Sequence, residues 1–534
     1  MRAAAIYGTL GALVLTAAGV APASSSPAAL PLPLPGSREA SGTATAARDA
    51  AAAGIDWKKC PAVEELQAPV RCGKVSVPVD YARPHGKQIE LTVSRRRATG
   101  PAAGRQGPLL YNPGGPGGSG MSFPLFGDRL GGVWKKLNSG YDFVGYAPRG
   151  VGRSAPLTCR DPKQADRGAG RAPRVPSAAF KRAMRAKAAA YAKGCAQRQG
   201  DRLDHWTTPD NARDLDVLRA ALGSPRLNFL GTSYGTYIGS VYATLFPRHV
   251  RRLVLDSVVD PRPDKIWYRS NLDQNPAFER RWNDWKRWVA RHDAAYGLGH
   301  TPKTVQRNFD AARDAVDRGR LGGSAGRSVG SRELVAGYLD VAYDDSTWAG
   351  HAAALAAFRK GDPRKLTGMV APDRAGAAGA AAAENSNAVY TAVQCSDAPW
   401  PRDWARWDRD NTALARRAPF NTWGNVWMNL PCAYWRGRQA QPVDVRAEPG
   451  LLPPVLLLAA TRDPATPYEG AVETWKRLSG SSLVTERGAG THGVTGGNSC
   501  ADKHLAAYLL HGTTPGRAAE CAPRPAPKPE RRSH

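Results

Sequence analysis

The segment that most constrains the fold of this chain is Gly231-Thr232-Ser233-Tyr234-Gly235, which lies between a strand-like run and a helix-like run. Residues 226–230 form the first run, and residues 237–243 have the small-residue spacing of a helix packed close to a sheet. A strand that turns abruptly into a helix strains its central residue, so only glycine or a residue nearly as small fits two positions either side. In this context the pattern predicts a nucleophile elbow that holds Ser233 above a sheet. An ordinary Gly-Ser turn is the alternative that the pentapeptide alone leaves open.

Buried strands, glycine-rich loops and helices alternate around the elbow, which is typical of a parallel sheet covered on both faces. The predicted strands are residues 74–79, 89–93, 108–111, 143–146, 226–230, 250–256, 454–460 and 483–485. Between about 260 and 450 the pattern is helical instead, since Phe278, Trp282, Trp285 and Val289 fall on one helix face. We therefore predict an α/β fold with a mostly parallel, doubly wound sheet and a large helical cap, inserted before the strand that leads to Asp463.

The chain divides by composition into five parts. Residues 1–23 read as a secretory signal peptide, with an apolar run and a small-residue cleavage site, although an uncleaved membrane anchor is the alternative. Residues 24–54 are rich in Ala, Pro and Ser and are predicted to be a linker or a pro-segment. The core is expected at 55–260 and again at 451–534, with an extended C-terminal tail, and the cap at 261–450. No later segment resembles a membrane span, so we expect a secreted, extracellular protein.

The formal net charge of +28 is large, but basic and acidic residues are interspersed. A nucleic-acid binder is expected to gather its basic residues into a stripe, so we predict no nucleic-acid partner. A basic exported protein can still be attracted weakly to anionic cell-wall polymers, because the attraction acts over long range.

The eight cysteines are an even number, which in an exported protein suggests disulfides. Neighbours in sequence suggest the pairs Cys60/Cys72, Cys159/Cys195, Cys395/Cys432 and Cys500/Cys521, although spacing alone does not fix the connectivity. No C-x-x-C pattern is present, so we expect no metal site and no cofactor.

A serine hydroxyl becomes a nucleophile only when a base removes its proton, and an acid must orient that base. In this fold the acid and the base follow the serine on loops after later strands. Asp463 follows the strand at 454–460, and His492 lies in a glycine-flanked loop after the last predicted strand. We therefore predict a Ser233, Asp463 and His492 triad. The rivals are Asp256 and Asp260 for the acid, and His504 and His511 for the base.

The glycine-rich loop 112–120, with the sequence N-P-G-G-P-G-G-S-G, follows an early predicted strand. An acyl-transfer enzyme needs two N–H donors for the oxyanion, one after the nucleophile and one from such a loop. Tyr234 and Gly115 are the predicted donors. A phosphate-binding loop is the weaker alternative because the known phosphate-loop patterns are missing.

Four motifs are specific in combination, namely N-P-G-G-P-G-G-S-G at 112–120, P-R-G-V-G-R-S at 148–154, G-T-S-Y-G at 231–235 and D-P-A-T-P at 463–467. Together they resemble the motifs of the secreted bacterial tripeptidyl aminopeptidases, which have the α/β-hydrolase fold and are similar to prolyl aminopeptidases. The resemblance implies a serine exopeptidase that releases short peptides, tripeptides by expectation, from the free N-terminus of peptides and proteins. One departure is Ala147, where many relatives of the wider group have aspartate before the P-R-G turn.

An exopeptidase must bind the α-ammonium group of its substrate, for which a carboxylate from the cap is suited. Glu384 and Asp397 are the candidates, and solvated cap residues are the alternative interpretation. Eleven of the fifteen tryptophans lie in the predicted cap, where most form its core and a few could line a peptide cleft. Fold and triad do not fix the acyl group, so a secreted esterase or amidase, or a prolyl aminopeptidase-like enzyme, stays open. A binding protein on a hydrolase scaffold is the competing class, but it would not need an intact triad.

Overall fold

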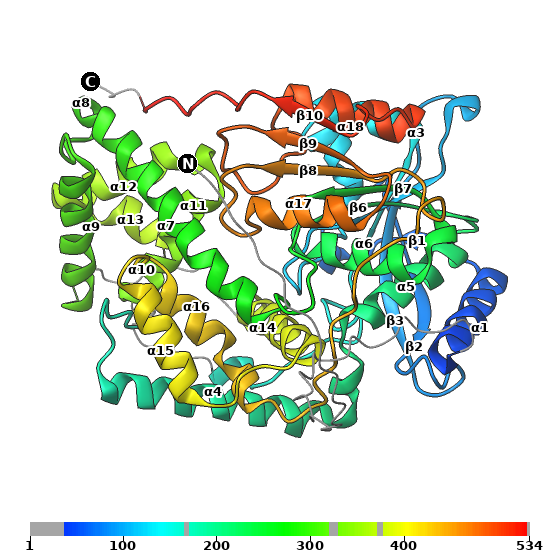
Figure 1. Cartoon of the computed structure of the whole chain (residues 1–534), viewed down its shortest axis with the longest axis horizontal. Coiled ribbons are helices and arrows are strands. Elements are labelled where there is room, and N and C mark those ends of the chain that lie inside the picture. The colour runs from blue at the N-terminus through cyan, green and yellow to red at the C-terminus, as the bar shows by residue number, and fades with distance from the viewer. Residues whose placement is uncertain (1–36, 165–169, 320–328, 371–376, 531–534) are drawn as a thin grey trace, which may run out of the picture.

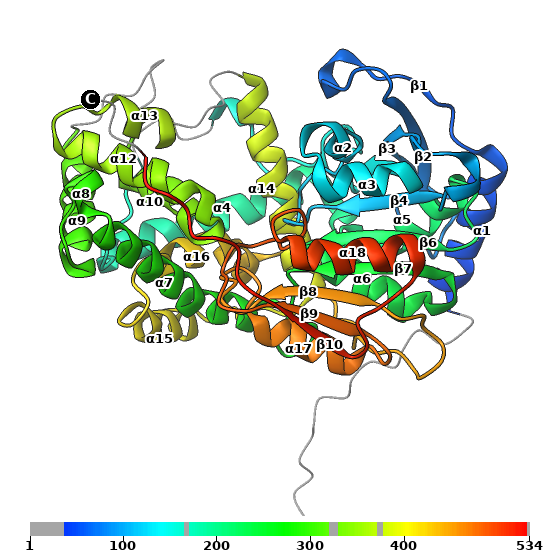
Figure 2. The same cartoon turned by 90° about the horizontal axis from the view of Figure 1, so that it is seen from above.

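The computed structural model describes residues 37–164, 170–319, 329–370 and 377–530. A sheet-containing half and a helical half lie side by side, and both views show the separation (Figures 1 and 2). The predicted signal peptide and the first part of the predicted linker lie outside the described residues.

The sheet has ten strands in the order β1-β2-β3-β5-β4-β6-β7-β8-β9-β10. The strands are β1 (Lys58–Lys59), β2 (Arg71–Pro78), β3 (Gln88–Arg96), β4 (Pro108–Asn112), β5 (Asp142–Tyr146), β6 (Leu227–Thr232), β7 (Val250–Asp256), β8 (Leu456–Ala460), β9 (Ser482–Glu486) and β10 (Ala518–Cys521). From β5 to β10 all neighbours pair in parallel, whereas β1, β2 and β3 add an antiparallel edge. Every predicted strand is present, and β1 and β10 are additional short edge strands.

Alternate residues of the central strands enter two separate cores. Leu110, Phe229 and Leu255 face the larger core, which includes side chains of α1 (Arg38–Ala53), α5 (Thr208–Ala221) and α6 (Tyr234–Leu245). Leu109, Leu230 and Val254 face the other, which includes side chains of α3 (Gly132–Gly140) and α18 (Ser499–His511). The remaining helices of this half are α2 (Phe126–Arg129) and α17 (Tyr468–Arg477). Helices therefore cover both sheet faces, and the predicted doubly wound α/β-hydrolase fold is confirmed.

Helix α1 occupies the second half of the segment predicted to be a linker or pro-segment, and it packs on α5. Its buried residues are Gly42, Thr43, Ala46, Ala47 and Ala50. A Cβ added to Gly42 would lie 1.7 Å from the carbonyl oxygen of Tyr81, so helix and core approach at backbone distance. Hydrophobic periodicity does not detect a helix whose contact face consists of such small residues.

The helical half follows β7, as predicted, but it also recruits a segment from before the elbow. Its helices after β7 are α7 (Tyr268–Arg291), α8 (Asp293–Tyr296), α9 (Pro302–Asp317), α10 (Ser331–Tyr338), α11 (Asp340–Tyr343), α12 (Trp348–Arg359), α13 (Arg364–Val370), α14 (Ala377–Asp397), α15 (Trp404–Ala415) and α16 (Thr422–Asn429). Helix α4 (Ala178–Gln199) runs along the lower edge of the same half in Figure 1. Trp282, Trp285 and Trp288 of α7 are fully buried in its core.

All four suggested disulfides are present, namely Cys60–Cys72, Cys159–Cys195, Cys395–Cys432 and Cys500–Cys521. The tail beyond Cys521 is extended and crosses from β10 to the helical half (Figure 1). There the carbonyl of Pro527 accepts a hydrogen bond from the indole of Trp288, at 3.0 Å. Among the described residues, no helix combines the length and apolarity needed to cross a membrane.

Candidate active site

Ser233 stands at the junction between β6 and α6 in a strained conformation, with φ 59° and ψ −125°. The left-handed region is unfavourable for residues other than glycine, so the surrounding structure must enforce it. A Cβ on Gly231 would lie 2.3 Å from the carbonyl oxygen of Gly235, and a Cβ on Gly235 would lie 2.5 Å from that of Asn112. The two flanking glycines thus have the steric role that the sequence predicts.

The imidazole of His492 hydrogen-bonds through Nδ1 to both carboxylate oxygens of Asp463, at 3.0 Å to Oδ1 and 2.9 Å to Oδ2. Asp463 is 1% exposed, and its Oδ1 also accepts hydrogen bonds from the backbone N–H groups of Ala465 and Thr466. The hydroxyl of Thr466 lies 3.4 Å from the same imidazole nitrogen. This carboxylate is therefore fixed by the loop that follows it and in turn orients the histidine.

Asp256, at the end of β7, connects the elbow with the loop between β9 and α18 that carries His492 (residues 487–498, the histidine loop). Its carbonyl oxygen accepts a hydrogen bond from the N–H of Ser233, at 3.0 Å. Its buried carboxylate accepts from the N–H groups of Val494 and Thr495, both at 2.9 Å, and from the Thr495 hydroxyl. Ser233 and the loop after His492 therefore meet at the same strand end.

The rival residues have other partners in the structure. Asp256 binds the loop backbone, and Asp260 forms a two-oxygen ion pair with Arg262. His504 and His511 both lie on α18. Of the acids and bases weighed from the sequence, Asp463 and His492 are the two that are bonded to each other.

Opposing effects act on the protonation of His492. Burial disfavours the imidazolium, but the charge and hydrogen bond of Asp463, together with the charge of Asp256, outweigh it and raise the pKa of His492 above its usual value. An imidazole of this kind accepts a proton readily, as a general base must.

The glycine-rich loop after β4 passes directly over the nucleophile. A Cβ on Gly114, where φ is +97°, would lie 2.9 Å from the Cβ of Ser233 and 2.9 Å from the amide nitrogen of Tyr234. The side chain of Asn112 holds this loop, because its Oδ1 accepts from the N–H of Gly114 and its Nδ2 donates to Tyr146. The segments that carry the predicted donors Gly115 and Tyr234 are thus in contact beside Ser233.

Helix α14 packs on the outer side of that loop. A Cβ on Gly117 would lie 2.6 Å from the carbonyl oxygen of Ser386. The neighbouring Asn385 donates to the carbonyls of Gly150 and Leu157 and accepts from the N–H of Gly152. The P-R-G-V-G-R-S turn therefore anchors the helical half against the sheet half.

The helical half also touches the histidine itself. The N–H of His492 donates to the carbonyl of Tyr343 at the end of α11, at 2.7 Å, and the two rings meet edge to face with centroids 5.5 Å apart. A cavity of about 350 Å³ lies close by, between the start of α7 and the loop after Asp463. Trp267, Gln274 and Thr466 are among its lining residues.

The two predicted amine ligands are both buried and hydrogen-bonded within the protein. Glu384 accepts from the side chains of Arg160 and Tyr191 and from two backbone N–H groups. Asp397 accepts from the N–H and hydroxyl of Thr208 and from the indole of Trp267. Burial raises the pKa of Asp397 to about 7. Only Asp397 is connected to the elbow, because the Thr208 hydroxyl also bonds the hydroxyl of Tyr234, at 2.8 Å.

The sequence did not indicate the residues whose side chains hydrogen-bond to the backbone of the histidine loop. The hydroxyl of Ser257 accepts from the N–H of Gly493, at 2.8 Å. On another side, Arg524 of the tail donates to the carbonyl of Gly493 and forms an ion pair with the buried Glu486. Asp256 was noticed only as a rival acid, and no local pattern marks Arg524, since both act through contacts distant in sequence.

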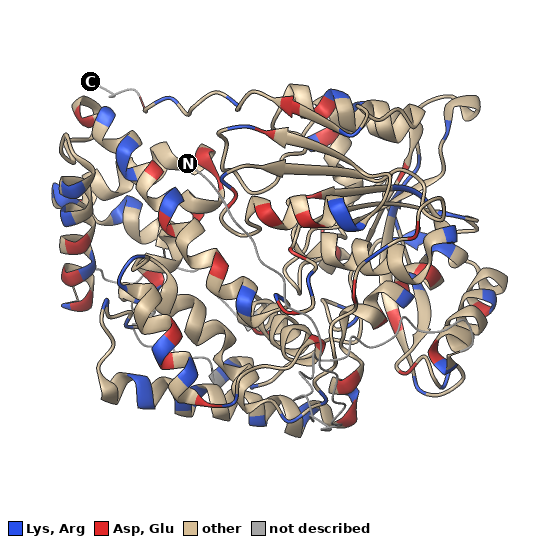
Figure 3. Cartoon of the chain, viewed as in Figure 1, with Lys and Arg blue, Asp and Glu red and all other residues tan. Residues whose placement is uncertain are grey.

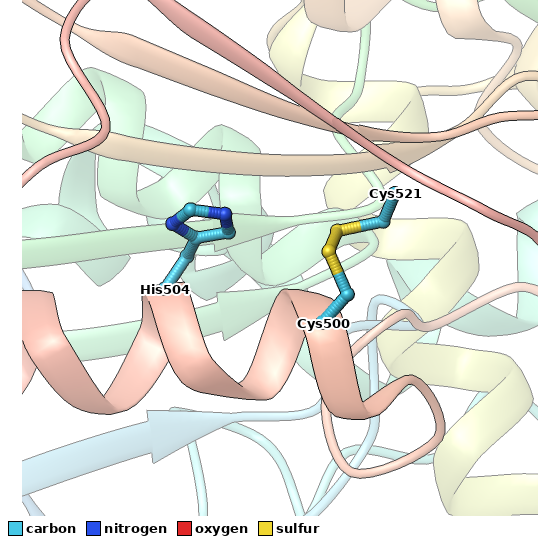
Figure 4. A group of neighbouring side chains, drawn as sticks. All are labelled: Cys500, His504 and Cys521. Atoms are coloured by element: carbon cyan, nitrogen blue, oxygen red, sulfur yellow. A yellow bond between two sulfur atoms is a disulfide. The ribbon is translucent and has the colours of Figure 1, made fainter.

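One group of potential metal ligands is present among the described residues, consisting of Cys500, His504 and Cys521. Figure 4 shows that the two sulfur atoms are joined to each other. A disulfide sulfur is not a thiolate, so with this bond formed the group lacks the ligands that zinc prefers.

Known proteins similar to this chain include two peptidases and a protein named a carboxylesterase. Residues 418–521 match the family model described as TAP-like protein. The chain is 52% identical to a tripeptidyl aminopeptidase of Streptomyces lividans over 536 residues, covering 99% of both chains. It is 32% identical to the serine protease Hip1 of Mycobacterium tuberculosis, covering 88% of this chain and 91% of that protein. A protein named carboxylesterase B from the same organism is also 32% identical, with 85% and 86% covered.

Proposed function

This chain belongs to the tripeptidyl aminopeptidase family of α/β-hydrolases, and we propose that Ser233, His492 and Asp463 are its nucleophile, general base and orienting acid. The observation that carries the proposal is the hydrogen bond between His492 Nδ1 and both oxygens of Asp463. With Nδ1 donating its proton to the carboxylate, Nε2 carries a lone pair and can accept the proton of a serine hydroxyl.

The reaction then proceeds through an acyl-enzyme. Ser233 Oγ attacks the scissile carbonyl while His492 Nε2 takes its proton, and the imidazolium returns that proton to the leaving amine. A water molecule, activated by the same histidine, releases the acyl group. The N–H groups of Gly115 and Tyr234 are proposed to bind the oxyanion, an arrangement that the contact between Gly114 and the elbow favours.

The substrate is a peptide or protein with a free N-terminus, and the product is a short peptide, a tripeptide by analogy with the Streptomyces relative. The helical half limits how much chain extends beyond the scissile bond on the acyl side, since α11 and α14 contact the histidine and the glycine loop. The 350 Å³ cavity beside Thr466 is of the size that binds small ligands and is proposed to take part of the peptide. Asp397 is the better placed of the two candidate amine ligands because of its connection to Tyr234.

Secretion is part of the proposal. Four disulfides support an oxidising compartment, and the N-terminal residues have the composition of a signal peptide.

A secreted esterase or amidase is the second candidate, because one relative at 32% identity is named a carboxylesterase. The same triad and oxyanion donors would serve either acyl group. The two functions differ in whether a free α-ammonium group is required.

One experiment separates them. The purified enzyme is assayed on chromogenic mono-, di- and tripeptide amides with free and with blocked N-termini, and on simple esters. Turnover of free tripeptide amides with little turnover of their blocked counterparts is the expected result, whereas activity on esters alone would contradict the peptidase. Ser233→Ala should abolish turnover while the thermal unfolding midpoint is retained, and unchanged turnover would refute the nucleophile.

A further inference from the structure

A row of cations crosses the antiparallel edge of the sheet. Lys59 of β1 is the direct cross-strand partner of Arg71 in β2, and Arg71 is the direct partner of Arg95 in β3. Directly opposed residues of antiparallel strands project on the same face with their Cβ atoms about 5 Å apart. Like charges in that position destabilise a sheet, so this row needs a compensating interaction.

The acidic residues of this region do not provide that compensation for the whole row. Asp128 pairs with Arg96, and Asp56 pairs with Lys58. Lys59, Arg71 and Arg97 are exposed, and none of them has a salt bridge to any residue in the described ranges.

The row borders an open groove of about 600 Å³. Its lining contains four arginines, at positions 71, 95, 96 and 97, together with Trp57, Pro69 and Thr99. The guanidinium of Arg95 stacks on Trp57, 4.2 Å from the ring centroid, which holds it in place. Burial and the positive charge of Arg97 lower the pKa of Arg95, although Asp142 opposes them.

The groove and the elbow lie at opposite ends of the strands. In the antiparallel pairing of β3 with β5, Val93 is opposite Tyr146 and Arg96 is opposite Phe143. The arginines are therefore at the amino-terminal edge of the parallel strands, whereas Ser233 follows the carboxyl end of β6. Figure 2 shows β1, β2 and β3 at the end of the molecule away from the helical half, and Figure 3 shows basic residues on both halves.

We propose that this groove binds a linear, phosphate-bearing polyanion and so retains the enzyme on an anionic matrix. Two strand spacings separate Lys59 from Arg95, about 10 Å, which suits a chain of charges rather than one ion. The planar guanidinium group of arginine binds phosphate through two parallel hydrogen bonds, and the oxygens of phosphate accept hydrogen bonds from several directions. The site is independent of the peptidase chemistry.

The test compares two triple variants that remove the same charge. Lys59→Gln, Arg71→Gln and Arg97→Gln together remove the exposed, unpaired cations of the row and of the groove, and they leave Arg95 on Trp57. The matched control is Arg402→Gln, Arg416→Gln and Arg417→Gln. These three arginines are exposed in the helical half and lack a salt bridge among the residues described. Binding of linear polyphosphate is measured at several salt concentrations, with orthophosphate as a second probe.

We expect the groove variant to bind polyphosphate about tenfold more weakly, with a salt-dependence slope lower by two to three, and the control to retain nearly wild-type binding. Without polyphosphate the groove variant should unfold at the same or a higher temperature than wild type, since repulsion is removed. Equal weakening in both variants, or no binding by wild type, would overturn the site. Orthophosphate binding as tight as polyphosphate binding would overturn the polymer. Tripeptide-amide turnover should be equal in all three proteins.

Discussion

Replacing Asp463 with asparagine tests the proposed triad, because the change alters which ring nitrogen of His492 carries the proton. Oδ1 of Asp463 accepts from the N–H groups of Ala465 and Thr466, so the asparagine oxygen must take that position. Its NH₂ group then occupies the Oδ2 position, 2.9 Å from Nδ1 of His492. The NH₂ group donates to Nδ1, so Nδ1 becomes the acceptor and the proton moves to Nε2, in competition with the tautomer that keeps Nδ1–H on Oδ1, 3.0 Å away. In that tautomer His492 cannot accept the proton of Ser233.

The expected loss is large because catalysis is removed while the shape of the site is kept. An aspartate-to-asparagine change of this kind lowers kcat by roughly 10⁴-fold, or about 5 kcal/mol at 1.36 kcal/mol per tenfold. The assay is kcat/KM on a free tripeptide amide, with thermal unfolding to show that the fold is kept. Asp362→Asn is the control, because Asp362 forms an exposed ion pair with Arg364 and lies outside the lining of the 350 Å³ cavity, and it should retain nearly wild-type activity. A loss below about tenfold for Asp463→Asn would refute the tautomer argument.

Three further predictions follow from the same contacts. Gly114→Ala should lower kcat by roughly 10²-fold or more, because its Cβ would displace the loop that is proposed to carry an oxyanion donor. In the pH profile of kcat/KM, the acid limb should lie above pH 6.5, because activity requires neutral His492 and the pKa of His492 is raised above that value. Asp256→Asn removes one of the charges that raise this pKa, so it should move the acid limb to lower pH. Arg524→Ala should lower the free energy of unfolding by about 3 kcal/mol in urea denaturation, because it leaves a buried carboxylate unpaired.

Each of these three predictions has a control variant or a result that would contradict it. Gly104→Ala, which meets no atom within 4 Å, should be silent, and full activity of Gly114→Ala would contradict the loop placement. An unmoved limb in Asp256→Asn would contradict the charge effect on His492. Arg487→Ala removes an exposed ion pair and should change stability little; a loss equal to that of Arg524→Ala would contradict the burial argument.

The sequence was informative wherever function depends on local geometry. The elbow at Ser233 needs small residues two positions away, and the strand ends before Asp463 and His492 follow from short buried runs. These features depend on neighbours within a few residues, so the parallel sheet and the positions of Ser233, Asp463 and His492 after strand ends could be predicted. The cap could be placed as well, because its helices interrupt the sheet pattern for nearly two hundred residues.

Features that depend on distant or small residues were not predictable in the same way. Helix α1 lacks large apolar residues on its buried face, so no periodicity marks it. Helix α4 joins a cap that begins about seventy residues later in the chain. Glu384 was chosen as a carboxylate in the cap, and only the fold shows that Arg160 and Tyr191 occupy its oxygens.

The histidine loop explains why long-range contacts matter most at this site. Its residues are held by Asp256 at a strand end, by Arg524 of the tail and, at the backbone of His492, by Tyr343 of the helical half. Each contact comes from a different part of the chain, and none belongs to the triad motif. In the proposed mechanism His492 exchanges a proton with Ser233, so a displacement of α11 by a substrate is expected to displace the base as well. We therefore expect the helical half to affect the rate of catalysis as well as the choice of substrate.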